Sequence, residues 1–175
     1  MQDRARIPEP SRGAIFRLMT EALTPAELAE QIAAARDRLL AFAAACADEQ
    51  WHAEPLAAQG DPRAVGVIVD HVADAYDYMM GWLREVVAGK NPHVDPAMVD
   101  RLNAAHAAGA VHLTQAGAME HLTRSGDELV AFVGRLSALD LDIADGRVRR
   151  LAEICVRHAD AHRGDLVLAL GASAG

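Results

Sequence analysis

The sequence predicts an all-α fold, and three features of its composition and patterning point to that class. Alanine is frequent along the 175-residue chain and only 4% of the residues are aromatic, a composition that suits closely packed helices better than sheets. In several long segments apolar residues recur three and four positions apart, which is the spacing of one helix face. A Thr-Pro or Asp-Pro pair precedes three helical stretches and is typical of a helix start.

The first predicted helix begins at Thr24. Thr24 can cap the helix, Pro25 suits its first turn, and Glu27 completes a capping box. The apolar stripe of this helix consists of Leu28, Ile32, Ala35, Leu39, Phe42 and Cys46. We expect residues 1–23 to form an N-terminal arm or a short helix, and residues 24–175 to form the bundle domain.

The second predicted helix runs from about Pro62 to Val87, with Asp61 as its cap. It carries two neighbouring stripes, so His71 is expected at the margin of a buried face. The first stripe is Val65, Val69, Val72, Tyr76, Met79 and Leu83, and the second is Ile68, His71, Ala75, Tyr78 and Trp82.

The segment after the second helix has a weaker pattern. Asp95 and Pro96 open a helical stretch that Gly109 and Gly117 interrupt. A stronger helix is predicted from near His112 to Leu136, with Gly126 lowering its propensity without forbidding it.

The last predicted helix runs from about Arg147 to Leu170, after a connection over residues 137–146. Its stripe is Val148, Leu151, Cys155, His158, His162 and Leu166, which places two histidines on the inward face. Four main helices in one bundle are therefore the simplest architecture.

Charge and composition limit the classes of partner. The chain has 17 basic and 25 acidic residues, a net charge of -8, so no basic field attracts nucleic acid. No run of about 18 apolar residues predicts a membrane span, and the N-terminus lacks the apolar core of a signal peptide. Cys46 and Cys155 fall inside helical patterns instead of forming a disulfide framework. We expect a cytoplasmic protein whose partner is a small molecule.

His158 and His162 are four residues apart, so both side chains can point at one spot from adjacent turns of a helix. Neutral imidazoles bind zinc, nickel, iron or manganese, and three protein ligands leave a position open for water or a thiol. The spacing alone is weak evidence, because 8 histidines in 175 residues give about 0.36 such pairs by chance. From the residues alone, two core histidines with separate partners remain an alternative.

With a third histidine, the pattern resembles the DinB/YfiT-like metalloenzyme family. The matching segments are "VIVDHVADAYDYM" with His71, and "RHADAHRGDL" with His158 and His162. In addition, "TPAELAEQIAAARDRLLAFAAACADEQW" is similar to the family's first helix, which closes on a tryptophan, here Trp51. The resemblance extends from about residue 24 to residue 170.

Two features depart from the family pattern. Asp165 stands where the family often has glutamine, which leaves the surroundings of the metal ligands open. Residues 89–111 match no specific segment of the family pattern. The resemblance therefore does not identify the residues that face the substrate.

This resemblance implies a fold, a metal site and a class of reaction. The fold is a four-helix bundle of up-down-down-up order, with a long crossover between helices two and three supplied by residues 88–111. His71, His158 and His162 would bind a divalent metal. Characterised relatives activate a low-molecular-weight thiol such as mycothiol or bacillithiol, as thiol transferases or as maleylpyruvate isomerase. The leading hypothesis is therefore a metal-dependent enzyme that activates a thiol or water for transfer, isomerisation or hydrolysis.

Two other functions stay open at this point. The first is a non-enzymatic metal-binding or stress-associated helical module, and the second is a metal-free bundle whose histidines are core residues. A homodimer is expected if Met79, Trp82 and Phe132 form exposed faces.

Several further side chains are weaker candidates, and for each of them packing or solvation is the simpler explanation. Asp74 and Asp165 could orient ligands, Tyr78 and Trp82 could line a pocket, and Arg149 and Arg150 could meet a cofactor carboxylate. His112 and His121 do not share a helical face, so a second metal site there is not expected. Cys46 and Cys155 are expected to pack as small apolar residues.

Overall fold

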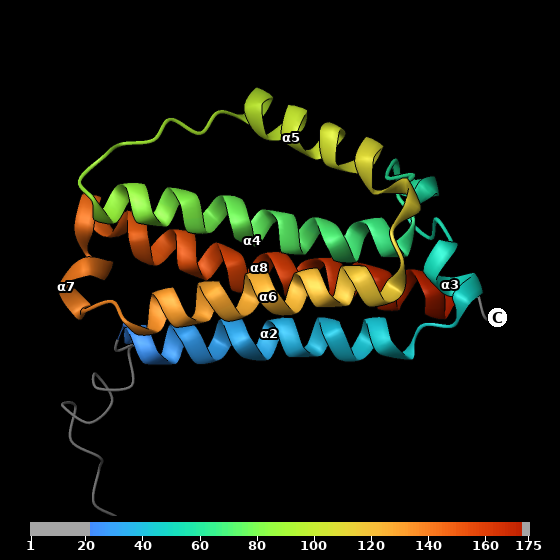
Figure 1. The fold of residues 1–175 in the computed structure, drawn as a ribbon, viewed down its shortest axis with the longest axis horizontal. Helices are drawn as coiled ribbons and strands as arrows, with labels where there is room; N and C mark the ends of the chain where they lie inside the picture. The colour runs from blue at the N-terminus through green and yellow to red at the C-terminus, as the bar shows by residue number, and fades with distance from the viewer. Residues whose placement is uncertain (1–21, 173–175) are drawn as a thin grey trace, which may run out of the picture.

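The computed structural model describes residues 22–172, and these residues form helices, turns and loops without a strand (Figure 1). The all-α prediction is confirmed. The long helices are α2 (Pro25–Ala45), α4 (Val65–Val87), α6 (Gln115–Gly134) and α8 (Ile143–Ala172). The shorter elements are α3 (Asp48–His52), α5 (Pro96–Gly109), α7 (Ala138–Leu141) and two 3₁₀ turns, η1 (Ala57–Gln59) and η2 (Ala110–His112). The predicted arm falls almost entirely in residues 1–21, outside the described residues.

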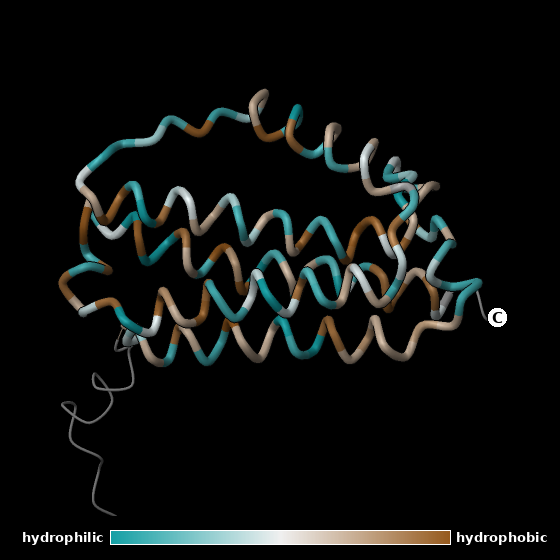
Figure 2. The backbone as a smooth tube through the Cα atoms, in the orientation of Figure 1, coloured by the Kyte–Doolittle hydropathy of each residue, from teal (hydrophilic) through white to brown (hydrophobic). Residues whose placement is uncertain are grey.

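The four long helices lie side by side and enclose one core (Figure 1). Helix α2 packs against α6 and α8, and α4 packs against the same two helices. Each long helix carries interspersed polar and apolar residues (Figure 2), and this pattern allows one face of the helix to be buried. The largest fully buried side chains include Tyr76, Leu28, Ile32, Leu39, Ile68, Leu83, Leu122 and Leu129. Within residues 22–172, no helix combines the length and the apolarity that crossing a membrane requires.

Helix α2 begins as predicted. The Thr24 hydroxyl accepts a hydrogen bond from the Glu27 backbone N–H at 3.2 Å, and a Glu27 carboxylate oxygen accepts one from the Thr24 backbone N–H at 2.8 Å. This capping box satisfies two backbone donors that the first turn would otherwise leave free.

The predicted start of helix α4 is wrong by three residues. The helix begins at Val65 and its N-cap is Ala64, which has no side-chain cap. Asp61 does not cap the helix, because its carboxylate is taken by Arg63, through the backbone N–H at 3.2 Å and the guanidinium at 2.8 Å. Asp61 therefore forms an ion pair with Arg63 and does not cap α4.

The weakly patterned region contains a regular helix, α5. Asp95 caps it by accepting a hydrogen bond from the Met98 N–H at 2.8 Å, and the helix ends at Gly109. Helix α6 starts at Gln115, three residues after the predicted start, because residues 110–112 form a 3₁₀ turn and Thr114 supplies the cap.

Helix α8 contains three residues in the left-handed conformation near its start. These are Ala144, Asp145 and Gly146, with φ angles of 51°, 54° and 76°. The regular part of the helix therefore begins at Arg147, where it was predicted. The short α7 lies inside the predicted connection, so that segment is partly helical.

Candidate metal centre

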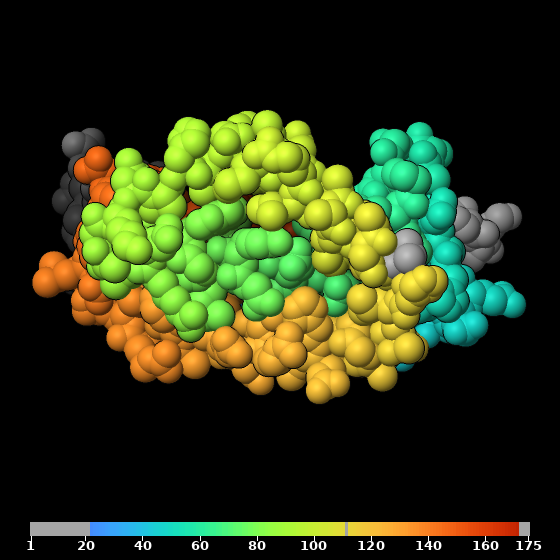
Figure 3. Space-filling view, turned by 45° about the horizontal axis from the view of Figure 1, so that its top comes forward, coloured from blue at the N-terminus to red at the C-terminus, as the bar shows by residue number. Residues whose placement is uncertain are grey.

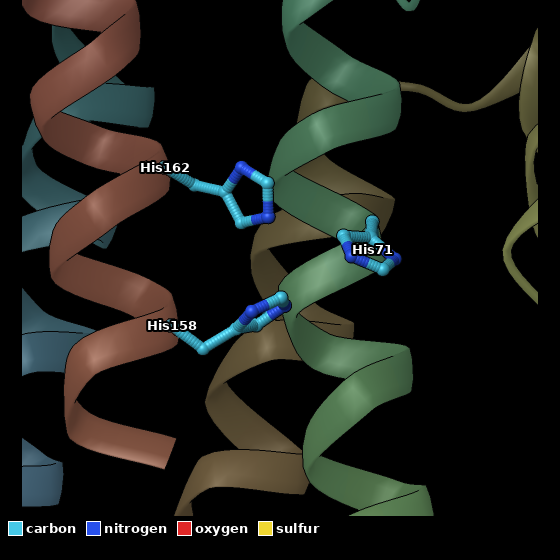
Figure 4. Close-up of side chains that lie close together, drawn as sticks. All are labelled: His71, His158 and His162. Carbon is cyan, nitrogen blue, oxygen red and sulfur yellow. The ribbon is translucent and has the colours of Figure 1, made fainter. Parts of the chain in front are cut away.

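The structure brings together the three histidines that the sequence singled out. His71 lies on α4, and His158 and His162 lie on the neighbouring helix α8 (Figure 4). The centroid of the His71 ring is 5.0 Å from that of His158 and 5.3 Å from that of His162, and the latter two are 4.6 Å apart. One nitrogen of each ring lies within 4.8 Å of the other two. These three residues could therefore hold a metal ion.

Packing of α4 against α8 produces this convergence. His158 and His162 share a face of α8 because they are four residues apart, and that face packs against α4. His71 is only 6% exposed, and the two partner histidines are half-buried. The site thus lies inside the bundle and not on its surface.

One observation indicates that the three histidines suit a divalent metal: within residues 22–172, two of their buried ring nitrogens lack a hydrogen-bond partner. Nδ1 of His71 and Nε2 of His158 are buried, and neither has a hydrogen-bond partner among the described residues. Such a group costs about 1–3 kcal/mol when its partner is missing, so buried imidazole nitrogens normally have one. A metal would supply that partner. Nitrogens on one tetrahedral metal lie about 3.3 Å apart, so rotation of the side chains would complete the site.

All three imidazoles are held in the neutral form that binds metals. Burial lowers the pKa of His71 to about 3, with further contributions from the nearby His158 and Arg63. Burial and the proximity of His162 lower the pKa of His158 to about 4. The pKa of His162 is also lowered, by burial and by Arg63. At neutral pH no proton competes with a metal for these nitrogens.

A second polar cluster lies beside the histidines and was missed in the sequence. Asp70 on α4 bonds to Nε2 of His106 on α5 at 2.8 Å and to Nδ1 of His121 on α6 at 2.7 Å. His121 Nε2 in turn lies 3.1 Å from a carboxylate oxygen of Asp77. We call Asp70, His106, His121 and Asp77 the Asp70 network.

The Asp70 network adjoins the candidate metal centre at His71. Asp70 directly precedes His71 in the chain, and the ring centroid of His106 is 5.8 Å from that of His71. Burial alone would raise the pKa of Asp70, but the hydrogen bonds with His106 and His121 outweigh it and lower the pKa to about 2. The hydrogen bond with Asp70 is the main reason why the pKa of His121 is raised. The only sequence signal was an aspartate inside the buried run "VGVIVDHV".

A cavity of about 290 Å³ lies beside two of the three histidines, His71 and His158. It lies between α4 and α8 beneath the segment that contains α5, and small openings are visible between α5 and α4 in Figure 3. Its lining residues include His71 and His158, so the cavity adjoins the candidate metal centre. Tyr78 and Trp82 also line it, which is the alternative to simple packing that the sequence left open, and their ring centroids are 6.4 Å apart in a stacked arrangement.

Comparison with known proteins identifies the family of the chain. The sequence profile of the DinB superfamily matches residues 14–166, which include all three histidines. The chain belongs to the DinB superfamily. No curated protein and no solved structure matches the chain.

The two aspartates proposed near the histidines have different surroundings in this DinB-superfamily chain. Asp74 lines the cavity, and burial raises the pKa of its carboxyl. Within residues 22–172 it has no hydrogen bond or ion pair, so it does not hold a ligand histidine in place. Asp165 is exposed.

Neither cysteine is suited to act as a nucleophile in this DinB-superfamily bundle. Cys155 is buried in the core and also lines the cavity, and burial raises the pKa of its thiol to about 12. Burial likewise raises the pKa of Cys46. Both thiols stay protonated at neutral pH, and the prediction of core packing is confirmed.

The predicted roles of two arginines are not supported by their positions. Arg149 donates to the Leu23 carbonyl and to Asp142, and Arg150 donates to the Asp145 carbonyl. Neither lines the cavity, whereas Arg147 does.

The apolar face expected to form a dimer is not fully exposed. Met79 and Trp82 line the cavity, and Phe132 is half-buried with the Arg84 guanidinium 5.8 Å from its ring centroid. The homodimer stays a prediction, and exposure of these three side chains no longer supports it.

Proposed function

We propose that this DinB-superfamily protein binds a divalent metal through His71, His158 and His162 and is a metal-dependent enzyme that acts on a small molecule. The observation that carries this proposal is the pair of buried, unpartnered imidazole nitrogens at the point where the three rings converge. Zinc, nickel, iron and manganese all suit three imidazole ligands. The adjoining cavity favours an enzyme over a site that only stabilises the bundle.

The residues around the site would each have a defined task. When bound, a metal held by three histidines offers an open position at which a low-molecular-weight thiol or water is activated. The apolar cavity wall excludes water from the bound small molecule. Asp74 lines the same cavity near His71 and is placed to hold or accept a proton. The protonated thiol of Cys155 leaves the nucleophile to the cofactor or to water.

We also propose that the bundle has the up-down-down-up order. The supporting observation is the chain direction in Figure 1, where α2 and α8 run from left to right and α4 and α6 from right to left. The segment that carries α5 then forms the crossover between α4 and α6.

The setting in the cell and the partners are part of the same proposal. We propose a cytoplasmic protein with a small-molecule substrate, no nucleic-acid or membrane partner, and a homodimeric state. The net charge of -8 supports the exclusion of nucleic acid.

Thiol-dependent turnover tests the enzymatic part of the proposal. Protein loaded with each candidate metal is mixed with low-molecular-weight thiols and an electrophilic aryl halide, and the thioether product is measured. We expect at least a ~10-fold rate above the uncatalysed reaction, lost in His158→Ala and kept in His112→Ala, since His112 is exposed. Metal-loaded protein without turnover of a thiol or of a hydrolysable substrate would instead support a non-enzymatic metal-binding module.

A further inference from the structure

The cavity beside the candidate metal centre is mostly apolar, and one arginine, Arg147, belongs to its lining. Its walls consist mainly of the side chains of Tyr78, Met79, Trp82, Val99, Leu102 and Ile154. His71 and His158 belong to the same lining. Arg147 is also part of the lining, and it is 11 residues before His158 on the same helix, which separates their backbones by about 16 Å along the axis.

The charge of Arg147 is not neutralised by any carboxylate within residues 22–172. Its guanidinium donates to the Asn91 side-chain oxygen and, at 2.6 Å, to the Pro92 carbonyl, and both acceptors are neutral. Three other arginines, Arg36, Arg38 and Arg63, each contact an aspartate. A guanidinium has five donors, so Arg147 keeps donors for a further acceptor.

The cavity lining also contains one carboxylate, which lies closer along the chain to His71 than to any other histidine of the site. Asp74 lies one turn after His71 and also lines the cavity. A bound anion would be repelled by this carboxylate when it is ionised and attracted by Arg147. The two groups together would orient an anionic ligand with its charged end away from the histidines.

We propose that the cavity binds a small amphipathic monocarboxylate, with the carboxylate on Arg147, the apolar body along Trp82 and Ile154, and the other end at His71 and His158. One guanidinium neutralises one negative charge, and its fork matches a carboxylate, whereas a phosphate dianion would leave a charge unpaired in an apolar site. At about 20–30 Å³ per non-hydrogen atom, 290 Å³ holds roughly ten to fifteen such atoms. The inference rests on the proposed function only where it makes this ligand the substrate.

Binding to metal-free protein tests the inference independently of the metal. Octanoate and octan-1-ol both carry an unbranched alkyl chain and differ in charge. Each is titrated by calorimetry, with tryptophan fluorescence of a Trp51→Phe background, in which Trp82 is the one tryptophan, as a second signal. Three variants are compared with the wild type. Arg147→Gln removes the charge, Arg150→Gln makes the same change at an arginine outside the cavity, and Asn91→Ala removes one partner of Arg147 but keeps its guanidinium.

We expect wild-type protein to bind octanoate on the order of ten- to a hundredfold more tightly than octan-1-ol, the range of a charge-assisted hydrogen bond. Arg147→Gln should remove that preference while binding of octan-1-ol stays within about twofold. Arg150→Gln and Asn91→Ala should keep the preference.

Two results would overturn the inference. The first is wild-type protein that binds both probes equally or binds neither. The second is a preference for octanoate that persists in Arg147→Gln, which would mean that Arg147 only anchors the loop at Asn91 and Pro92. Because the titrations contain no metal, failure of the metal site would leave either result unchanged.

Discussion

At the scale of single residues, the buried carboxylate of Asp70 joins three helices through its hydrogen bonds. It is 4% exposed and holds His106 of α5 and His121 of α6 from its position on α4. Removal of one member of a buried charged group is costly, because the partners keep their desolvation penalty.

We therefore predict that Asp70→Asn lowers the free energy of unfolding by about 3 kcal/mol. Asp77→Asn makes the same change at a carboxylate whose side chain is 44% exposed, and it should cost less than about 1 kcal/mol. Urea unfolding of the metal-free proteins measures both. A loss below about 1 kcal/mol in Asp70→Asn would contradict a stabilising role for the buried contacts of Asp70 with His106 and His121.

The sequence was informative about the ligand residues and silent about this network. His158 and His162 could be predicted because they replace apolar residues on a regular stripe, and the family pattern supplied His71. His106 could not be predicted, because no helical periodicity says where the crossover segment lies over the bundle. Asp70 was detectable only as a charge inside an apolar run.

At the level of elements, the short helix α3 packs onto α4 at a glycine. A Cβ atom at Gly66 would lie 2.5 Å from Cε2 of Trp51, a rigid ring that is 3% exposed. This close approach requires a residue without a side chain at position 66. The contact joins the end of the first helical unit to the start of the helix that carries His71.

We predict that Gly66→Ala lowers the free energy of unfolding by about 1–2 kcal/mol, because overpacking against Trp51 exceeds the gain in helix propensity. Gly81→Ala on the same helix has open space around the new methyl group, and it should stabilise the protein by up to about 1 kcal/mol. Thermal unfolding followed by circular dichroism compares them. A stabilised Gly66→Ala would contradict this packing.

The sequence pattern predicted which segments are helical. The exact first residue of a helix depends on side-chain contacts that this pattern does not show. Thr24 and Asp95 cap their helices as their sequence motifs predict. Asp61 looks equivalent in the sequence, but Arg63 two residues later takes its carboxylate. Competition between neighbouring side chains for one acceptor therefore decided the start of α4.

For the whole molecule, three buried neutral histidines make stability depend on pH. The folded-state pKa is about 3 for His71 and about 4 for His158, and it is also lowered for His162, against about 6.5 in the unfolded chain. Between pH 6.5 and 5 the unfolded state therefore binds more protons, so acid favours unfolding. The stabilising effect of the raised pKa of His121 is already complete below pH 6.5 and does not oppose this trend.

We predict that metal-free protein loses stability as the pH falls from 6.5 to 5, by up to about 1.4 kcal/mol per pH unit for each histidine. Urea midpoints at a series of pH values, with a chelator present, measure this slope. His158→Gln should reduce the slope by roughly one third, since one of three similar groups is removed. Stability that stays constant or rises over this range would contradict neutral burial of the three rings.

The most direct test of the central claim is the metal content of protein purified without a histidine tag, measured by mass spectrometry. We predict about one divalent metal per chain in the wild type and in His112→Ala, and its loss in His71→Ala, His158→Ala and His162→Ala. Wild-type protein that takes up none of zinc, nickel, iron or manganese, even when each is supplied after purification, would contradict the claim. The three histidines would then be core residues.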